Sequence, residues 1–263
     1  MAHKVYENFV LENRIEDMLI TGVDMNAYMT VDYSLTEEAG MKKVIHVYTA
    51  TGNVEELGMG EGNTQAITVG HDEVEYEVGV TQGLFSYYDE EEMKDPMVVE
   101  VGLRKTSANM TNDLTTKVIA ELGKATLEVP NFAWDFDGVV DAIALLNTED
   151  EAGLFMLINP AEKAEFRKNL KDDLKYSEGF VRKGYIGSVA GVPVIVSKAV
   201  PAGEAYLATK EAVTCFVKKG VEIEQERDAN HRKNDIIARK VMLVALTDAS
   251  QAVKLVGAVV DGE

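Results

Sequence analysis

The longest helical pattern in the sequence runs from about Pro96 to Lys124. Five apolar residues recur at steps of four and seven and would share one helical face: Leu103, Met110, Leu114, Val118 and Leu122. Pro96 suits a first helical turn, Asp95 can cap its free N–H groups, and Asp89–Glu92 is expected to be a solvated connector. Such a helix would span roughly 40 Å, longer than an ordinary globular domain needs. The pattern therefore predicts a spine to which other elements attach.

The composition excludes several classes of function. The 263 residues carry a formal net charge of −19, with 46% hydrophobic and 27% charged residues. This excess of carboxylates repels nucleic-acid phosphates, so sequence-specific DNA binding is not expected. Cys215 is the single cysteine, which rules out an internal disulfide framework and suits a reducing compartment. The sequence shows neither a membrane-spanning apolar run nor a signal-peptide pattern, so we expect synthesis and folding in a cytoplasm and no membrane partner.

The N-terminal residues contain a weakly amphipathic stretch that Gly22 would end. The apolar residues of this stretch are Leu11, Ile15, Met18 and Leu19. Two interpretations remain open: a terminal segment packed on its own domain, or an arm that packs on a neighbouring subunit. Farther along, Ser34–Glu37 fits a capping box, and Gly40 would stop that helix within two turns.

Residues 43–81 predict two strands joined by a long, glycine-rich loop. Residues 43–49 are rich in β-branched and aromatic side chains, which is typical of a strand. In the second strand, apolar residues alternate with acidic residues or glycine, which indicates one apolar and one solvated face. The apolar residues of this strand are Val74, Tyr76, Val78 and Val80. The intervening glycines predict the mobile tip of a long hairpin.

The glycine-rich loop lacks the features of a phosphate-binding loop. Such loops lie between a strand and a helix, and a P-loop also needs a lysine. Here a strand follows the glycines, and no Lys or Arg occurs between Lys43 and Lys94. A long hairpin that projects from a small body leaves its apolar face without a partner. We therefore expect another subunit to supply that partner.

The residues after the long helix predict a compact α/β unit. Val129–Asn131 would break the pattern, and Asp137 would cap a helix with an apolar face. Asp135, Asp137 and Asp141 do not have the spacing of an EF-hand calcium loop. Asn159–Glu162 forms the strongest local helix start in the chain. Strands are expected at Leu154–Ile158, Val192–Val196, Ala205–Ala208, Val221–Glu226, Val241–Leu246 and Lys254–Val256.

The order of these elements resembles that of the tailed-bacteriophage major capsid proteins of the Hong Kong 97 type. The resemblance is carried by the Asn159–Pro160 helix start, Gly191–Val194, Ala205–Tyr206, Lys210–Val213 and Glu224–Arg227. It extends back to the long helix, the two-stranded loop and the N-terminal segment, and so covers nearly the whole chain. It implies an α+β fold with an N-terminal arm (1–35), an extended hairpin loop (43–82), a peripheral domain (83–131 and 221–263, with a spine helix at 96–124) and an axial domain (132–220).

The resemblance also implies a function. Subunits of this type form pentamers and hexamers that close into an icosahedral phage head around double-stranded DNA. The implied partners are other copies of the chain, portal and scaffolding proteins, and a cement or decoration protein. The expected assembly contacts are Phe9, Leu11, Ile15, Leu19, Gly52, Gly58, Gly60, Gly62, Asn63, Val74, Tyr76, Val78 and Val80.

Two departures from the family pattern matter. Some relatives lock their shells with an isopeptide bond from a lysine in the extended loop, but the sequence has no lysine from residue 44 to residue 93. That crosslink is therefore not expected here. Some relatives also carry a long N-terminal scaffolding extension. Because the arm begins almost at Met1, we expect the scaffold to be a separate protein or to be unnecessary.

Two other functions remain as alternatives. Encapsulin shells share the implied fold but enclose cargo proteins instead of DNA. An enzyme could use Asp135, Asp137 or Asp141 together with one of the histidines His3, His46, His71 and His231. The chain shows no nucleophile elbow, no paired metal-ligand histidines and no Walker lysine loop. We therefore assign no catalytic residue, no metal site and no cofactor.

Overall fold

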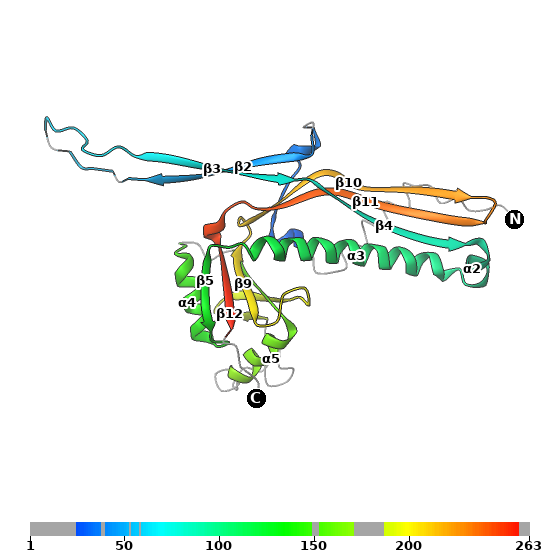
Figure 1. The fold of residues 1–263 in the computed structure, drawn as a ribbon. Helices are drawn as coiled ribbons and strands as arrows, with labels where there is room; N and C mark the ends of the chain where they lie inside the picture. The colour runs from blue at the N-terminus through cyan, green and yellow to red at the C-terminus, as the bar shows by residue number, and fades with distance from the viewer. Residues whose placement is uncertain are drawn as a thin grey trace.

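The computed structural model describes residues 25–37, 40–52, 54–57, 59–148, 153–170 and 187–257. Within these residues the chain forms an elongated α+β structure whose three sheets contain four, six and two strands. The four-stranded sheet lies along one long helix, and the six-stranded sheet forms a compact unit near one end of that helix (Figure 1). The predicted arm contacts Phe9, Leu11, Ile15 and Leu19 lie outside the described residues.

The predicted spine is α3, Met97–Leu122. Its five stripe residues are buried, as the sequence predicted: Leu103, Met110, Leu114, Val118 and Leu122. Asp95 caps the helix as expected, because its Oδ1 accepts a hydrogen bond from the Met97 N–H at 2.9 Å. Gly102 lowers helix propensity, yet packing requires it. A Cβ atom there would lie 2.3 Å from the ring of Phe85.

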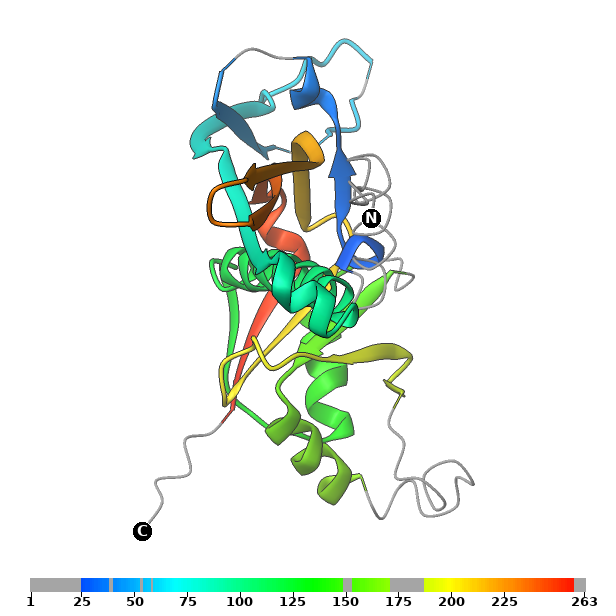
Figure 2. The same ribbon diagram turned by 90° about the vertical axis from the view of Figure 1, so that its right-hand side faces the viewer.

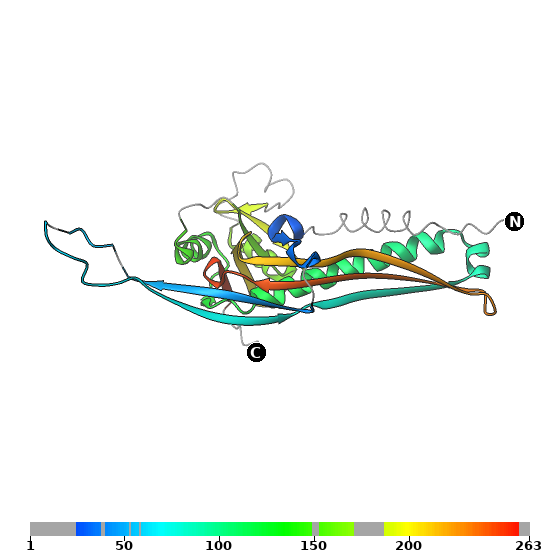
Figure 3. The same ribbon diagram turned by 90° about the horizontal axis from the view of Figure 1, so that it is seen from above.

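The four-stranded sheet has the order β1-β10-β11-β4. Its strands are β1 (Thr30–Asp32), β10 (Val213–Asp228), β11 (Lys233–Leu246) and β4 (Gly79–Tyr88). A polar turn after Asp228 joins β10 to β11. One face packs on α3 through a cluster of Tyr87, Val99, Leu103, Met110, Ile223, Ile236 and Ala238. Figure 3 shows how far this sheet and α3 extend together on one side of the molecule.

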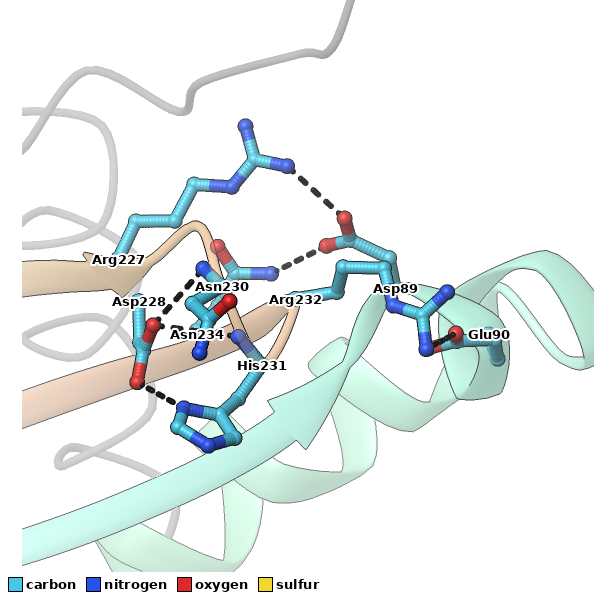
Figure 4. A network of polar contacts seen from close by, with 8 residues as sticks. All are labelled: Asp89, Glu90, Arg227, Asp228, Asn230, His231, Arg232 and Asn234. Atoms are coloured by element: carbon cyan, nitrogen blue, oxygen red, sulfur yellow. Dashed lines mark hydrogen bonds and ion pairs between the residues drawn. The ribbon is translucent and has the colours of Figure 1, made fainter.

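The acidic residues before α3 form a short helix, α2 (Asp89–Lys94), without a buried residue, so the solvated connector expected from the sequence is helical. Asp89 is drawn inward because its carboxylate accepts hydrogen bonds from Arg227 Nη2 at 2.9 Å and Asn234 Nδ2 at 2.8 Å (Figure 4). Arg232 forms an ion pair with Glu90 at 2.9 Å. These contacts join the turn between β10 and β11 to the start of the spine.

We expect Asp89→Ala to lower the free energy of unfolding by about 1–3 kcal/mol. The substitution leaves the amide of Asn234, which is 6% exposed, without its carboxylate partner. Chemical denaturation would measure the loss. Glu90→Ala is the matched control, because its ion pair with Arg232 is more than half exposed and contributes little. Equal stability of both variants would contradict this account.

The six-stranded sheet has the order β5-β12-β9-β6-β8-β7. Its strands are β5 (Leu127–Phe132), β12 (Ala252–Gly257), β9 (Glu204–Thr209), β6 (Leu154–Ile158), β8 (Val192–Val196) and β7 (Ser188–Val189). Side chains from one face of β6, including Phe155 and Leu157, share a core with α3. Met156 and Ile158 alternate with them and share a core with α4 (Phe136–Leu146) and α5 (Pro160–Asn169). The sheet therefore lies between the spine and two short helices (Figure 2).

Two local predictions in this unit were wrong. Val129–Asn131 does not break the pattern but belongs to β5. This is an edge strand, where a proline such as Pro130 costs no ladder hydrogen bond. Asp135, not Asp137, caps α4, because its Oδ1 accepts from the Gly138 N–H at 2.8 Å. The start of α5 agrees with prediction, since Asn159 Oδ1 accepts from the Ala161 N–H at 3.0 Å.

The described residues also form three short 3₁₀ helices: η1 (Met25–Tyr28), η2 (Ser34–Thr36) and η3 (Ala249–Gln251). The predicted capping box at Ser34 does not form. Instead Asp32 Oδ1 accepts from the Ser34 N–H at 2.7 Å, which favours a single tight turn. No helix among the described residues is long and apolar enough to cross a membrane.

Sheet membership divides the chain differently from the domain boundaries predicted above, which remain a prediction. β12 was assigned to the peripheral domain, but it pairs with β9 and β5 in the six-stranded sheet. β10 begins at Val213, inside the range predicted for the axial domain, and belongs to the four-stranded sheet. The chain therefore passes from the six-stranded sheet to the four-stranded sheet between β9 and β10, and returns to the six-stranded sheet between β11 and β12.

Candidate assembly surfaces

The hairpin predicted from the sequence consists of β2 (Lys42–Thr51) and β3 (Thr68–Glu77). The strands pair antiparallel in unbroken register from Lys42↔Glu77 to Thr51↔Thr68. Ten residues of strand extend roughly 30 Å, and Figures 1 and 3 show the hairpin projecting beyond the rest of the molecule. Most of its length therefore has no partner within the described chain.

The register gives the hairpin two chemically different faces. Ile45 pairs with Val74 and lies on one face together with Tyr76. Glu73 and Glu75 point to the other face, as the alternating pattern predicted. Val74 is 41% exposed, whereas Ile45, its cross-strand partner, is 9% exposed. At this level the apolar face is therefore covered on its β2 side and partly uncovered on its β3 side.

The root of the hairpin packs on the four-stranded sheet, on the side away from α3. The buried residues of this root cluster are Leu35, Ile45, Val78, Phe216, Leu243 and Ala245. The Val78 N–H donates a hydrogen bond to the Met41 carbonyl oxygen at 2.8 Å, at the point where β3 ends and β4 begins. The sequence had predicted one strand through Val80, but Val80 lies in β4 and pairs with Val241. Val78 is thus a core residue of its own subunit.

Tyr76 connects the hairpin root to the end of the spine. Lys124 Nζ lies 5.7 Å from the centre of the Tyr76 ring, and Lys124 also pairs with Glu121 at 2.6 Å. Burial, followed by the negative charge of Glu121, raises the pKa of the Tyr76 hydroxyl above its usual value. Tyr76 therefore stays neutral at physiological pH and fixes the hairpin against α3.

The tip of the hairpin is a polar loop that carries exposed apolar side chains. Gly52 has a φ of +135°, and a Cβ atom there would lie 3.0 Å from the Ile67 Cα, so a side chain at this position would be strained. Glu55 accepts a hydrogen bond from the Thr64 N–H at 2.7 Å and closes the loop internally. The exposed apolar residues are Val54, Leu57, Met59, Ile67 and Val69. Of the predicted tip contacts, Gly52, Gly60, Gly62 and Asn63 are exposed, and Gly58 lies outside the described residues.

The structure brings together two histidines that the sequence left isolated. His46 Nδ1 lies 3.5 Å and His71 Nε2 lies 4.0 Å from the same Glu73 oxygen, on the acidic face of the hairpin. The two residues are 25 positions apart in the chain, so only the strand register reveals their proximity. Among the described residues, no group of three or more His, Cys, Asp or Glu side chains is arranged to hold a metal ion.

The residues proposed for an enzyme do not form a catalytic arrangement. Asp135 and Asp137 line an open cavity of about 1030 Å³, together with Asn169 and Ser188. Asp135 is already used as the helix cap. His231 lies in the turn between β10 and β11, near α2 and not in the lining of this cavity (Figure 4). His46 and His71 lie on the hairpin, so none of the described histidines lines the cavity beside these carboxylates; His3 lies outside the described residues.

A spine helix along an elongated sheet, a projecting hairpin and a compact sheet unit together define the capsid fold of the Hong Kong 97 type. The structure of Mycobacterium phage Che8 matches with a TM-score of 0.65 at 14% identity, over 82% of this chain and 85% of that chain. The mature capsid of bacteriophage PhiM1 matches with a TM-score of 0.65 at 12% identity, over 89% and 87%. A virus-like particle from Pyrococcus furiosus also shares the fold, with a TM-score of 0.65 at 13% identity over 94% and 98%.

Sequence comparison identifies the family. The family described as phage capsid protein matches residues 72–255, and the chain therefore belongs to it. A major capsid protein of Staphylococcus phage phiMR11 is 28% identical over 148 residues, which are 55% of this chain and 54% of that protein. The match thus spans about half the length of this curated relative. Both findings concern phage capsid proteins, so the encapsulin alternative is not favoured.

Proposed function

We propose that this chain is a major capsid protein that self-assembles as pentamers and hexamers into an icosahedral phage head around double-stranded DNA. The observation that carries the proposal is the hairpin. Its root is packed on its own subunit, while β3 and the tip expose apolar residues such as Val74 and Met59. A second copy is the natural source of the missing partner, because the fold repeats the same surfaces on every subunit.

The roles of the regions follow from the same proposal. Of the arm expected at residues 1–35, residues 1–24 act on a neighbouring subunit. Residues 25–35 instead pack on their own subunit, because β1 pairs with β10 and Leu35 belongs to the root cluster. Residues 43–82 form the extended loop. The peripheral domain (83–131 and 221–263) and the axial domain (132–220) build the wall. The contacts within this set are those predicted from the sequence, from Phe9 to Val80, except that Val78 acts through the fold of its own subunit.

The proposal also covers partners and location. The chain acts as a component of the virion, without enzymatic activity, and is assembled in the cytoplasm of a host bacterium with portal and scaffolding proteins. The net charge of −19 suits a wall that encloses DNA without binding it tightly. A cement protein would bind the outside of the finished shell.

Electron microscopy of the purified, untagged protein, with light scattering of the same sample, tests the proposal. We expect closed shells, rings or tubes, alone or with a scaffolding protein present. Nucleic acid inside particles from infected cells would support a phage head, and a protein cargo would support an encapsulin. A monomer or dimer under all these conditions would overturn the proposal.

Boiled, denatured particles should run as single chains on a denaturing gel. The described hairpin carries lysines only at its root, where Lys42 forms an ion pair with Glu75 and Lys43 lies 5.6 Å from the ring centre of Phe216. Neither lysine reaches the tip, where an isopeptide bond to another subunit would form. A ladder of covalent oligomers would contradict this prediction.

A further inference from the structure

The first half of α3 has a face that no other described element covers. Figure 1 shows this half running beyond the six-stranded unit, with the four-stranded sheet on one side only. Val99 and Leu103, which face the sheet, are 4% and 1% exposed, whereas Met97 and Val101 are 54% and 58% exposed. Because Met97 and Val101 are four residues apart, they form one apolar stripe along the outer face of the helix. Met93, at the end of α2, is 77% exposed.

Charges of opposite sign lie at the two ends of this stripe. The N-terminal end is acidic, since Glu90, Glu91 and Glu92 of the first turn of α2 carry carboxylates, while Asp89 is turned inward and Lys94 ends the helix. The C-terminal end is basic, with Arg104 and Lys105 both exposed. Arg104 pairs with Glu100 at 3.3 Å, an exposed contact that contributes little to stability.

We propose that two copies of this chain pair antiparallel through this stripe, around a two-fold axis near residues 97–101. An antiparallel pair places Met97 of one copy beside Val101 of the other and buries both apolar patches. It also brings Arg104 and Lys105 of each copy against the acidic α2 of its partner. A parallel pair would set like charges beside each other, so the charge order selects the antiparallel arrangement. The inference rests on the proposed assembly from many copies, and assigns one contact within it.

An introduced cysteine tests the contact, because the native Cys215 is buried. Particles of Met97→Cys should give a dimer with a short bis-maleimide reagent, since helices in contact lie about 8–10 Å apart. Thr116→Cys is the matched control, as Thr116 is an exposed residue of the same helix. In the proposed pair, the two copies of position 116 would be roughly 50 Å apart and should not crosslink.

Charge reversal supplies a second, independent test. In the Met97→Cys background, R104E with K105E should lower the yield of dimer about three- to tenfold, and adding E91K with E92K should restore it. These residues are on the surface, so thermal unfolding should confirm that each variant is folded. Val101→Cys replaces Met97→Cys if the latter does not assemble.

The outcomes separate the inference from the proposed function. Particles that form normally but yield no dimer through position 97 or 101 would overturn the inference and leave the shell assignment intact. Protection of the cysteine without crosslinking would assign this face to another protein or to another part of the same chain, and would equally overturn it. Absence of particles from the unmodified protein would count against the shell assignment itself.

Discussion

Val78→Asp should abolish particle formation and destabilise the hairpin root by several kcal/mol. Val78 is 7% exposed and belongs to the cluster with Ile45, Phe216 and Leu243. An aspartate there would be a buried charge without a partner, among the most destabilising of single substitutions. With its root released, the hairpin would lose a fixed direction and could no longer reach a neighbouring subunit. The six-stranded unit has its own core and should stay folded.

Val80→Asp is the matched control for stability, since it makes the same chemical change two residues farther along; Val80 is itself an expected assembly contact. Val80 is 56% exposed in β4, so its substitution should change the free energy of unfolding by less than about 0.5 kcal/mol. Hydrogen exchange of β2 and β3 measures the effect on the root, and electron microscopy measures assembly. Fast exchange is expected for Val78→Asp alone. Normal shells from Val78→Asp would contradict the role of the root cluster.

Elements with a complete local signal were predicted well. The spine has a repeating apolar face, and Asp95 and Pro96 mark its start. β6 is a short, fully apolar run with all five residues buried, and α5 begins at an asparagine followed by proline. In each of these cases the residues that decide the structure lie within a few positions of one another. Tertiary contacts then agree with the local preference and do not override it.

Elements that depend on distant partners were predicted incompletely. Val221–Glu226 was expected as a strand, but β10 runs from Val213 to Asp228 through Gly220. The structure accommodates this region by register shifts near Lys219, where the pairing with β11 is irregular. Likewise β5 needs its edge position beside β12 to tolerate Pro130. The register of β10 and the edge position of β5 depend on residues of the partner strands, so the sequence of each segment alone does not reveal them.

The candidate assembly surface shows the same division. The glycines and the alternating acidic residues predicted a hairpin with two faces, and the register confirms those faces. The alternation could not show where the hairpin leaves its own subunit. That point is Val78, and it is set by contacts with β10 and β11 more than 130 residues away. The outer stripe of α3 was also missed, because two exposed residues give no periodic signal.

Shortening the hairpin should prevent closed shells without unfolding the subunit. Thr51 and Thr68 form the last cross-strand pair, so Asn-Gly can replace residues 52–67 as a two-residue turn of the type that strand twist favours. The removed residues make no contribution to the root cluster, and the free energy of unfolding should change by less than about 1 kcal/mol. The variant would lose both the reach of the loop and its exposed apolar side chains.

A second variant separates these two losses. It keeps the full loop and replaces Val54 and Met59, which are 91% and 108% exposed, with serine. If apolar contact at the tip holds neighbouring subunits together, the serine variant should also fail to close, because each buried apolar side chain stabilises by about 1.5–3 kcal/mol and the contact repeats at every subunit. If reach alone matters, the serine variant should form shells and the shortened one should not. Shells of normal size from the shortened variant would show that the tip is not an assembly contact. The partner of the exposed hairpin face would then have to be sought along β3, near Val74.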